Sequence, residues 1–175
     1  SQRIAESGCR GGMLAAGISA ADAQEYLQTL PSESVVVACV NSPSSVTLSG
    51  NIEEINLLEK RLQADGCFAR KLRVDTAYHS PHMRALADDY KAAIESIQPV
   101  DSYNGSISMF SSVTKELLQA ADLDASYWVR NLVSPVEFAA AVTKVVTMTE
   151  AGRGRGRRRV VPVKWAGFLE IGPHE

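Results

Sequence analysis

Apolar positions in the first half of the chain alternate between strand-like and helix-like spacing. A short apolar run over residues 13–18 predicts a strand. Ser19 follows it, with Asp22 at the spacing of a capping box, which predicts a helix that ends before Pro31. The segment therefore begins with a strand followed by a helix.

Two hairpin strands, a helix and a last strand complete this segment. The β-branched runs 35–40 and 46–48 flank a Ser/Pro-rich turn, which predicts a hairpin. Asn51 predicts the N-cap of a helix that Gly66 ends, and alternation over 68–74 predicts a half-buried strand. Its buried side chains are expected to be Phe68, Leu72 and Val74. The resulting order is β-α-β-β-α-β, the split βαβ pattern.

The second half of the chain carries further helix signals. Ser80 followed by Pro81 predicts an N-cap with proline at N1, opening a helix that Pro99 stops. Its apolar stripe is Met83, Leu86, Tyr90, Ile94 and Ile97. Short strands are expected over 107–112 and 168–171.

Two more helices are expected between these strands. Asp122 or Asp124 predicts the cap of a helix that carries Tyr127, Trp128 and Leu132. Ser134 and the proline after it repeat the cap-plus-proline signal before an apolar helix over 138–146.

Composition places the chain among ordinary globular proteins. Of its 175 residues, 45% are hydrophobic and 22% are charged, and no apolar run is long enough to span a membrane. We therefore expect a cytoplasmic protein that does not bind a membrane. Its three cysteines stand singly, which argues against a disulfide framework or a zinc site and favours reduced, buried thiols.

The net charge of −2 hides a basic tract near the C-terminus. The tract contains Arg153, Arg155, Arg157, Arg158, Arg159 and Lys164. Without these six the chain has 12 basic and 20 acidic residues, a balance of −8. Because the rest of the chain is acidic, it would repel the phosphates of a nucleic acid, and we expect no nucleic-acid partner. We interpret residues 152–164 as an exposed Arg/Gly-rich loop. RNA binding through the tract is a weaker alternative, testable by its salt dependence.

His79 is the most interesting of the three histidines. It stands one residue before the Ser80 cap, where the positive end of a helix disfavours imidazolium and leaves the ring able to accept a proton. A surface histidine beside a cap is the structural alternative. A metal site of His79, His82 and His174 lacks any supporting acidic or cysteine ligand, so we expect no metal.

Five stretches together resemble the malonyl-CoA:acyl-carrier-protein acyltransferase domain, most closely that of fungal iterative polyketide synthases. They are GGMLAAG (11–17), VNSPSSVTLSG (40–50), VDTAYHSPHM (74–83), YWVRNLVSPVEF (127–138) and LEIGPH (169–174). The resemblance implies an α/β fold in which a ferredoxin-like small subdomain is inserted in a hydrolase-like acyltransferase subdomain. It implies that residues 11–75 are the small subdomain. Residues 1–10 and 76–175 then belong to the large one, which is incomplete here.

The resemblance also implies the site. His79 matches the catalytic histidine, Asn131 the residue whose backbone carbonyl holds that histidine, and Tyr78 and Asn41 substrate-binding positions. The serine of a G-H-S-x-G elbow, the glutamine loop and the malonyl-binding arginine match no part of this chain and belong upstream of Ser1. The chain is therefore expected to be inactive alone.

The implied reaction moves a malonyl group from coenzyme A to the phosphopantetheine thiol of an acyl carrier protein through a seryl ester, with no bound cofactor. The implied partners are malonyl-CoA, the carrier protein and neighbouring synthase domains. A non-catalytic ferredoxin-like binding or assembly module is the alternative, because residues 11–75 alone would suffice for it. A G-H-S-x-G motif upstream in the parent reading frame would decide for the enzyme.

Overall fold

The computed structural model describes residues 10–99, 108–152 and 159–169. The first part of the chain folds as β-α-β-β-α-β, in the expected order. Its elements are β1 (Gly11–Ala16), α2 (Ala20–Gln28), β2 (Val36–Ser42), β3 (Ser45–Asn51), α3 (Ile52–Ala64) and β4 (Ala69–Lys71).

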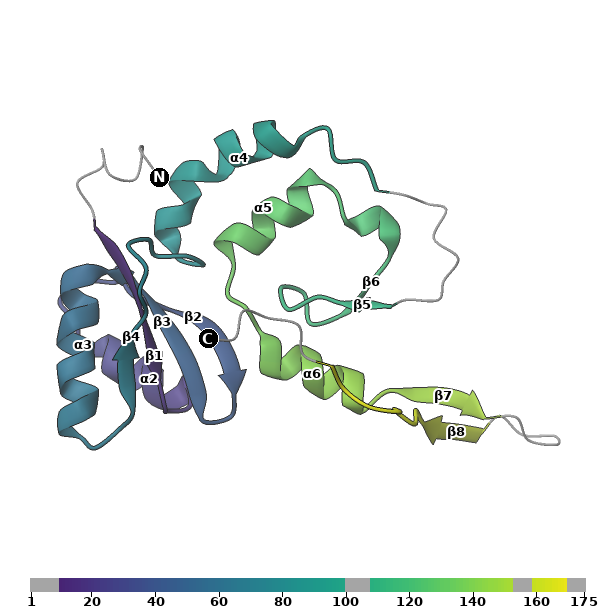
Figure 1. The fold of residues 1–175 in the computed structure, drawn as a ribbon, viewed down its shortest axis with the longest axis horizontal. Helices are drawn as coiled ribbons and strands as arrows, with labels where there is room; N and C mark the ends of the chain where they lie inside the picture. Colours follow the sequence, from purple (N-terminus) through teal and green to yellow (C-terminus); the bar gives the residue numbers. More distant parts are fainter. Residues whose placement is uncertain (1–9, 100–107, 153–158, 170–175) are drawn as a thin grey trace.

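The four strands form one antiparallel sheet in the order β2-β3-β1-β4. β2 and β3 pair as the expected hairpin, and Leu14 of β1 lies opposite Leu48 of β3. Leu14 and Leu48 are fully buried in one core with Ile55, Leu58 and Leu62 of α3. Helices α2 and α3 therefore cover one face of the sheet (Figure 1).

The local signals that start and end these helices act as expected. Ser19 caps α2 in a capping box with Asp22, and the Asn51 side chain accepts the backbone N–H of Glu53 at the start of α3. Gly66 follows α3 with a φ of 74°, a left-handed conformation that glycine adopts without steric cost.

The expected burial of the last strand is wrong. Ala69 is the buried residue of β4, whereas Phe68 is 61% exposed and Leu72 and Val74 are exposed as well. The strand is also shorter than the expected 68–74, since β4 ends at Lys71 and leaves Phe68, Leu72 and Val74 outside it. Its register with β1 places Ala69 opposite Ala16 of the core. Alternation gave the period of the strand, but pairing decided which face turned inward.

Beyond the sheet, the chain forms short helices and two small strand pairs. The elements are η1 (Pro81–Leu86), α4 (Ala87–Ile94), β5 (Met109–Phe110), β6 (Leu117–Leu118), η2 (Ala120–Asp122), α5 (Ala125–Val133) and α6 (Phe138–Val146). Ser80 caps η1 with Pro81 in its first turn, as expected.

Three expectations for this part need correction. The single helix from Ser80 to Pro99 is instead a 3₁₀ turn followed by α4, which ends at Ile94 and leaves Ile97 exposed. Asp124 caps α5, but Ser134 is the C-cap of α5 and no side chain caps α6. Among the described residues of the first expected strand, 108–112, Met109–Phe110 form a strand, and Phe168 and Leu169 of the second are exposed and outside any strand. Residues 107, 170 and 171 lie outside the described residues.

The Arg/Gly-rich tract is also less loop-like than expected. β7 (Thr149–Gly152) pairs with β8 (Arg159–Pro162), so the ends of the tract form an antiparallel hairpin that extends away from α6 (Figure 1). The loop was expected from the Arg and Gly content of the tract, but Val160 and Val161 are residues that favour extended backbone. Residues 153–158 lie outside the described residues.

The sheet and the remainder of the chain meet at the free edge of β2. Val136 pairs with β2 in parallel through two hydrogen bonds, Val136 N–H to the Ala38 carbonyl at 2.8 Å and Val40 N–H to the Val136 carbonyl at 2.9 Å. The loop between α5 and α6 is therefore fixed to the sheet.

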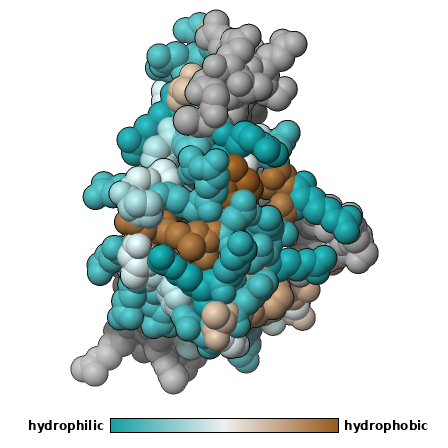
Figure 2. All heavy atoms as spheres, turned by 90° about the vertical axis from the view of Figure 1, so that its left-hand side faces the viewer, coloured by the Kyte–Doolittle hydropathy of each residue, from teal (hydrophilic) through white to brown (hydrophobic). Residues whose placement is uncertain are grey.

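The surface on the α3 side is mostly hydrophilic, with apolar residues gathered in separate patches (Figure 2). No described helix is long and apolar enough to cross a membrane. Cys39 and Cys67 are free and half-buried, not fully buried as expected, and burial raises the pKa of the Cys39 thiol. Cys9 lies outside the described residues.

Candidate active site

His79 stands in a tight turn that its buried neighbours hold in place. The hydroxyl of Ser80 donates to the Ala77 carbonyl at 2.7 Å and accepts the backbone N–H of His82 at 3.2 Å. Ala77 and Ser80 are both buried, so this turn cannot move without breaking a water-excluded hydrogen bond.

The backbone of His79 is in the left-handed region, with a φ of 57°. This conformation is costly for a residue with a Cβ atom, and such residues persist where the surrounding structure holds them, often at functional sites. The strain here coincides with the histidine that the sequence singled out.

The ring of His79 is held by two backbone carbonyls. Its Nδ1 atom lies 3.1 Å from the carbonyl oxygen of Asn131 and 3.1 Å from that of Ser134. A carbonyl oxygen can only accept a hydrogen bond, so Nδ1 carries the proton in this arrangement. In the neutral ring, this tautomer leaves the lone pair on Nε2, the atom that can act as a base.

Helix α5 supplies these carbonyls because of where it ends. The last carbonyls of a helix have no partner within it, and Asn131 lies in the last turn while Ser134 is the C-cap. The expected contact between His79 and the Asn131 carbonyl is present. The contact with Ser134 was missed, although the proline after it, which cannot continue a helix, marks the end of α5.

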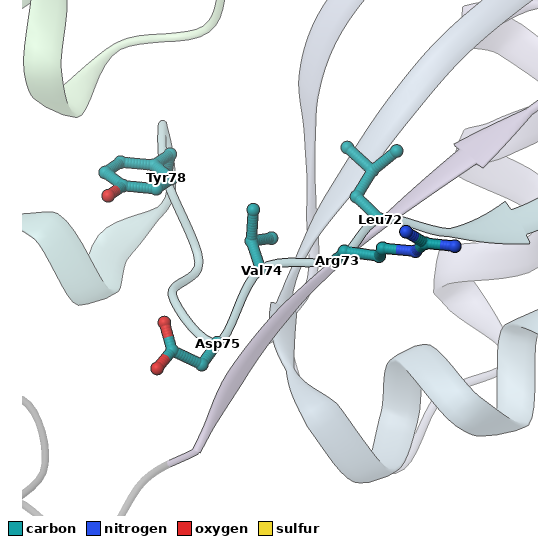
Figure 3. Close-up of a pocket in the computed structure, with 5 residues that line it drawn as sticks. All are labelled: Leu72, Arg73, Val74, Asp75 and Tyr78. Atoms are coloured by element: carbon teal, nitrogen blue, oxygen red, sulfur yellow. The ribbon is translucent and has the colours of Figure 1, made fainter. Parts of the chain in front are cut away.

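Tyr78 lines a shallow surface pocket of about 510 Å³. The other lining residues are Leu72, Arg73, Val74 and Asp75. Leu72 and Val74 point to the same side of their segment, Asp75 lies below Tyr78 in the view, and Arg73 extends away from Tyr78 (Figure 3). The Tyr78 side chain, 44% exposed, thus stands at an open edge of this pocket.

Asn41 lies at the end of β2, and its side-chain amide donates to the hydroxyl of Thr47 on β3 at 3.2 Å. Within the described part of the chain it has no hydrogen bond to Tyr78 or His79. The structure therefore joins His79 with Asn131 but does not bring Asn41 into that cluster.

His82 is half-buried at the start of η1. The described residues contain no group of three His, Cys, Asp or Glu side chains that could hold a metal ion. His174 lies outside those residues.

Residues 1–153 match the family model described as the acyl transferase domain. The chain belongs to this family. It is similar to fungal highly reducing polyketide synthases, being 61% identical over 175 residues to the synthase cnsI of Penicillium expansum. It is 50% identical over 168 residues to the synthase alnA of Emericella nidulans. These alignments cover 100% and 95% of the chain but only 7% of each relative, so the chain spans a small fraction of their length.

Solved acyltransferase domains share the fold. The acyltransferase domain from module 8 of the salinomycin polyketide synthase is 31% identical with a TM-score of 0.72, covering 78% of this chain and 31% of that chain. A loading acyltransferase from the avermectin modular polyketide synthase is 28% identical with a TM-score of 0.70, covering 82% of this chain and 45% of that one. The chain therefore has the α/β structure of part of a polyketide synthase acyltransferase domain.

Proposed function

We propose that this chain is the C-terminal part of an acyltransferase domain that moves malonyl from coenzyme A to the phosphopantetheine thiol of an acyl carrier protein, with His79 as general base. The observation that supports this most directly is the pair of carbonyls at Nδ1 of His79, which leaves Nε2 free to take a proton. The nucleophilic serine would come from a part of the domain outside this chain.

In the first half-reaction, Nε2 of His79 takes the serine proton while the serine oxygen attacks the thioester carbonyl of malonyl-CoA. The carbon–sulfur bond breaks, and the departing coenzyme A thiolate takes the proton back from the ring. A malonyl ester on the serine and a free thiol result.

In the second half-reaction, His79 takes the proton of the phosphopantetheine thiol, and the thiolate attacks the seryl ester. The carbon–oxygen bond breaks and the serine oxygen recovers the proton. Both halves need the ring in one tautomer, and the two carbonyls would fix that tautomer as the carboxylate of a Ser-His-Asp triad does, although without its negative charge.

The pocket beside Tyr78 supports malonyl as the acyl group. A tyrosine ring next to the base would occupy the space that an α-methyl group needs, and one such group changes selectivity by about 10- to 200-fold. Asn41, near the end of β2, belongs in this proposal as a further substrate-binding residue.

The strand order β2-β3-β1-β4 supports the assignment of residues 11–75 as a ferredoxin-like small subdomain. Residues 1–10 and 76–175 would then belong to a hydrolase-like large subdomain, completed by other parts of the synthase. A non-catalytic binding module would need only residues 11–75. That alternative gives no role to the left-handed backbone of His79 or to the two carbonyls at its ring.

The test is to incubate the complete domain with malonyl-CoA and measure its intact mass. We expect one added malonyl group on a serine outside this chain, which is lost when the phosphopantetheine form of the carrier protein is added. The 175-residue chain alone, measured in parallel, should stay unlabelled. Failure of the complete domain to become labelled, or stable labelling of a serine within these 175 residues, would overturn the assignment.

A further inference from the structure

We propose that the four-stranded sheet β2-β3-β1-β4 positions the base at two places. Gly11 at the start of β1 lies against the turn that carries His79, and Val136 ties the loop that contacts the His79 ring to the edge strand β2. This inference rests on the proposed function of His79. Gly11 and Val136 are then positioning residues, since neither has a described contact with the His79 ring.

Gly11 packs against the backbone of the turn that carries His79. A Cβ atom built on Gly11 would lie 2.5 Å from the backbone nitrogen of Ala77 and 2.9 Å from its Cβ. Such distances are not tolerated between real atoms, and the nearest one belongs to the backbone. The start of β1 therefore approaches the Ala77 backbone so closely that only glycine fits there.

The neighbouring glycine provides a contrast within the same strand. A Cβ atom on Gly12 would also meet an atom too closely, at 2.6 Å, but that atom is the terminal Cδ1 of Ile52. A methyl group at the end of a side chain can swing aside, and its next nearest contacts are ordinary at 3.7 Å. Gly12 faces α3, whereas Gly11 faces the His79 turn.

On the other side, Val136 ties the carbonyl pair to the sheet. It lies two residues after Ser134, whose carbonyl accepts from His79, and its N–H and carbonyl both pair with the free edge of β2. Glu137, the next residue, donates to the Ser112 carbonyl at 2.7 Å. The loop that holds the ring is thus fixed by backbone bonds that do not depend on side-chain identity.

Both contacts act on the same ring, one through the backbone that carries it and one through the carbonyls that orient it. A misplacement of about 1 Å in a catalytic group can lower the rate by as much as 10²-fold. We therefore expect a clash at Gly11 to reduce turnover much more than it changes substrate binding.

The experiment compares Gly11→Ala with Gly12→Ala in the complete acyltransferase domain, using malonyl-CoA and a phosphopantetheinylated carrier protein. Gly11→Ala should lower kcat at least tenfold with little change in KM for malonyl-CoA, while Gly12→Ala stays within about threefold of wild type. Thermal melts of both variants separate loss of fold from loss of geometry.

A spectroscopic readout follows the ring itself. Long-range ¹H–¹⁵N correlation of the His79 imidazole should show the Nδ1–H tautomer in wild type and in Gly12→Ala, and a mixture of tautomers in Gly11→Ala. If Gly11→Ala does not fold, replacing the amide of Val136 by an ester removes one bond to β2 and keeps the side chain. That variant should show the same tautomer mixture and the same fall in kcat.

The outcomes separate this inference from the proposed function. Equal kcat values and spectra for the two glycine variants, or an unchanged ring in the ester variant, would overturn the positioning role even if His79 is the base. A fully active domain lacking the His79 imidazole would overturn the function itself.

Discussion

The Nδ1 atom of His79 lies 3.1 Å from the carbonyl oxygen of Asn131, although the two residues are 52 positions apart in the chain. The contact joins the turn before η1 to the last turn of α5. Because the acceptor is a backbone atom, this relationship can survive substitution of the Asn131 side chain.

Asn131→Gln should accordingly lower acyl transfer by the complete domain only a few-fold, because the substitution keeps the carbonyl that His79 contacts. Ser134→Ala should be mild for the same reason. Steady-state transfer to the carrier protein measures both. A loss for Asn131→Gln as large as that caused by removing the imidazole would mean that the side-chain amide takes part in the chemistry.

Ser80→Ala should destabilise the chain by about 1–3 kcal/mol, since it removes the cap of η1 and leaves the Ala77 carbonyl without its partner. Urea denaturation monitored by circular dichroism would measure this. Ser44→Ala is the matched control, because Ser44 is exposed and its hydroxyl has no described hydrogen bond. Equal stabilities of the two variants would show that the Ser80 bond does not hold the turn.

Tyr78→Ser should shift acyl choice toward methylmalonyl. We expect wild type to prefer malonyl-CoA by about tenfold to a hundredfold in direct competition, and the variant to lose most of that preference. Tyr90→Ser on α4, away from the residues that line the pocket, serves as the control. The interpretation fails if wild type prefers methylmalonyl-CoA or if the ratio is the same in all three proteins.

Replacing residues 153–158 by Asn-Gly should leave the thermal midpoint within about 2 °C of wild type, because this stretch consists of Arg and Gly and offers no apolar side chain to a core. Gly152 pairs with Arg159 at the end of the β7–β8 hairpin, so a two-residue turn can close it. Acyl transfer by the complete domain should be unchanged. A fall of many degrees would show that the segment is structural.

The sequence predicted those features of the fold that depend on neighbouring residues. The caps at Ser19, Asn51, Ser80 and Asp124 are local hydrogen bonds, and each is present. Features that depend on distant partners were less accessible. The face of β4 was misjudged because its pairing with β1, which buries Ala69, joins segments more than 50 residues apart.

The candidate site likewise has local features that the sequence predicted and long-range contacts that it did not. The cap-plus-proline signal at Ser80 placed His79 beside a helix cap, but only the family resemblance linked it to Asn131. No local pattern indicates that α5 would end with two carbonyls at one imidazole ring, or that Gly11 would lie against the turn from β1. These contacts arise from the packing of elements that the sequence presents separately.

The central claim is that His79 is the base, and replacing it by glutamine in the complete domain tests this most directly. Glutamine keeps a polar side chain of similar size but cannot take a proton near neutral pH. With His82→Gln as the matched control, we predict that malonyl transfer falls by about 10²- to 10⁴-fold for His79→Gln and by no more than a few-fold for His82→Gln. Transfer at near wild-type rate by His79→Gln, or equal losses in the two variants, would contradict the account.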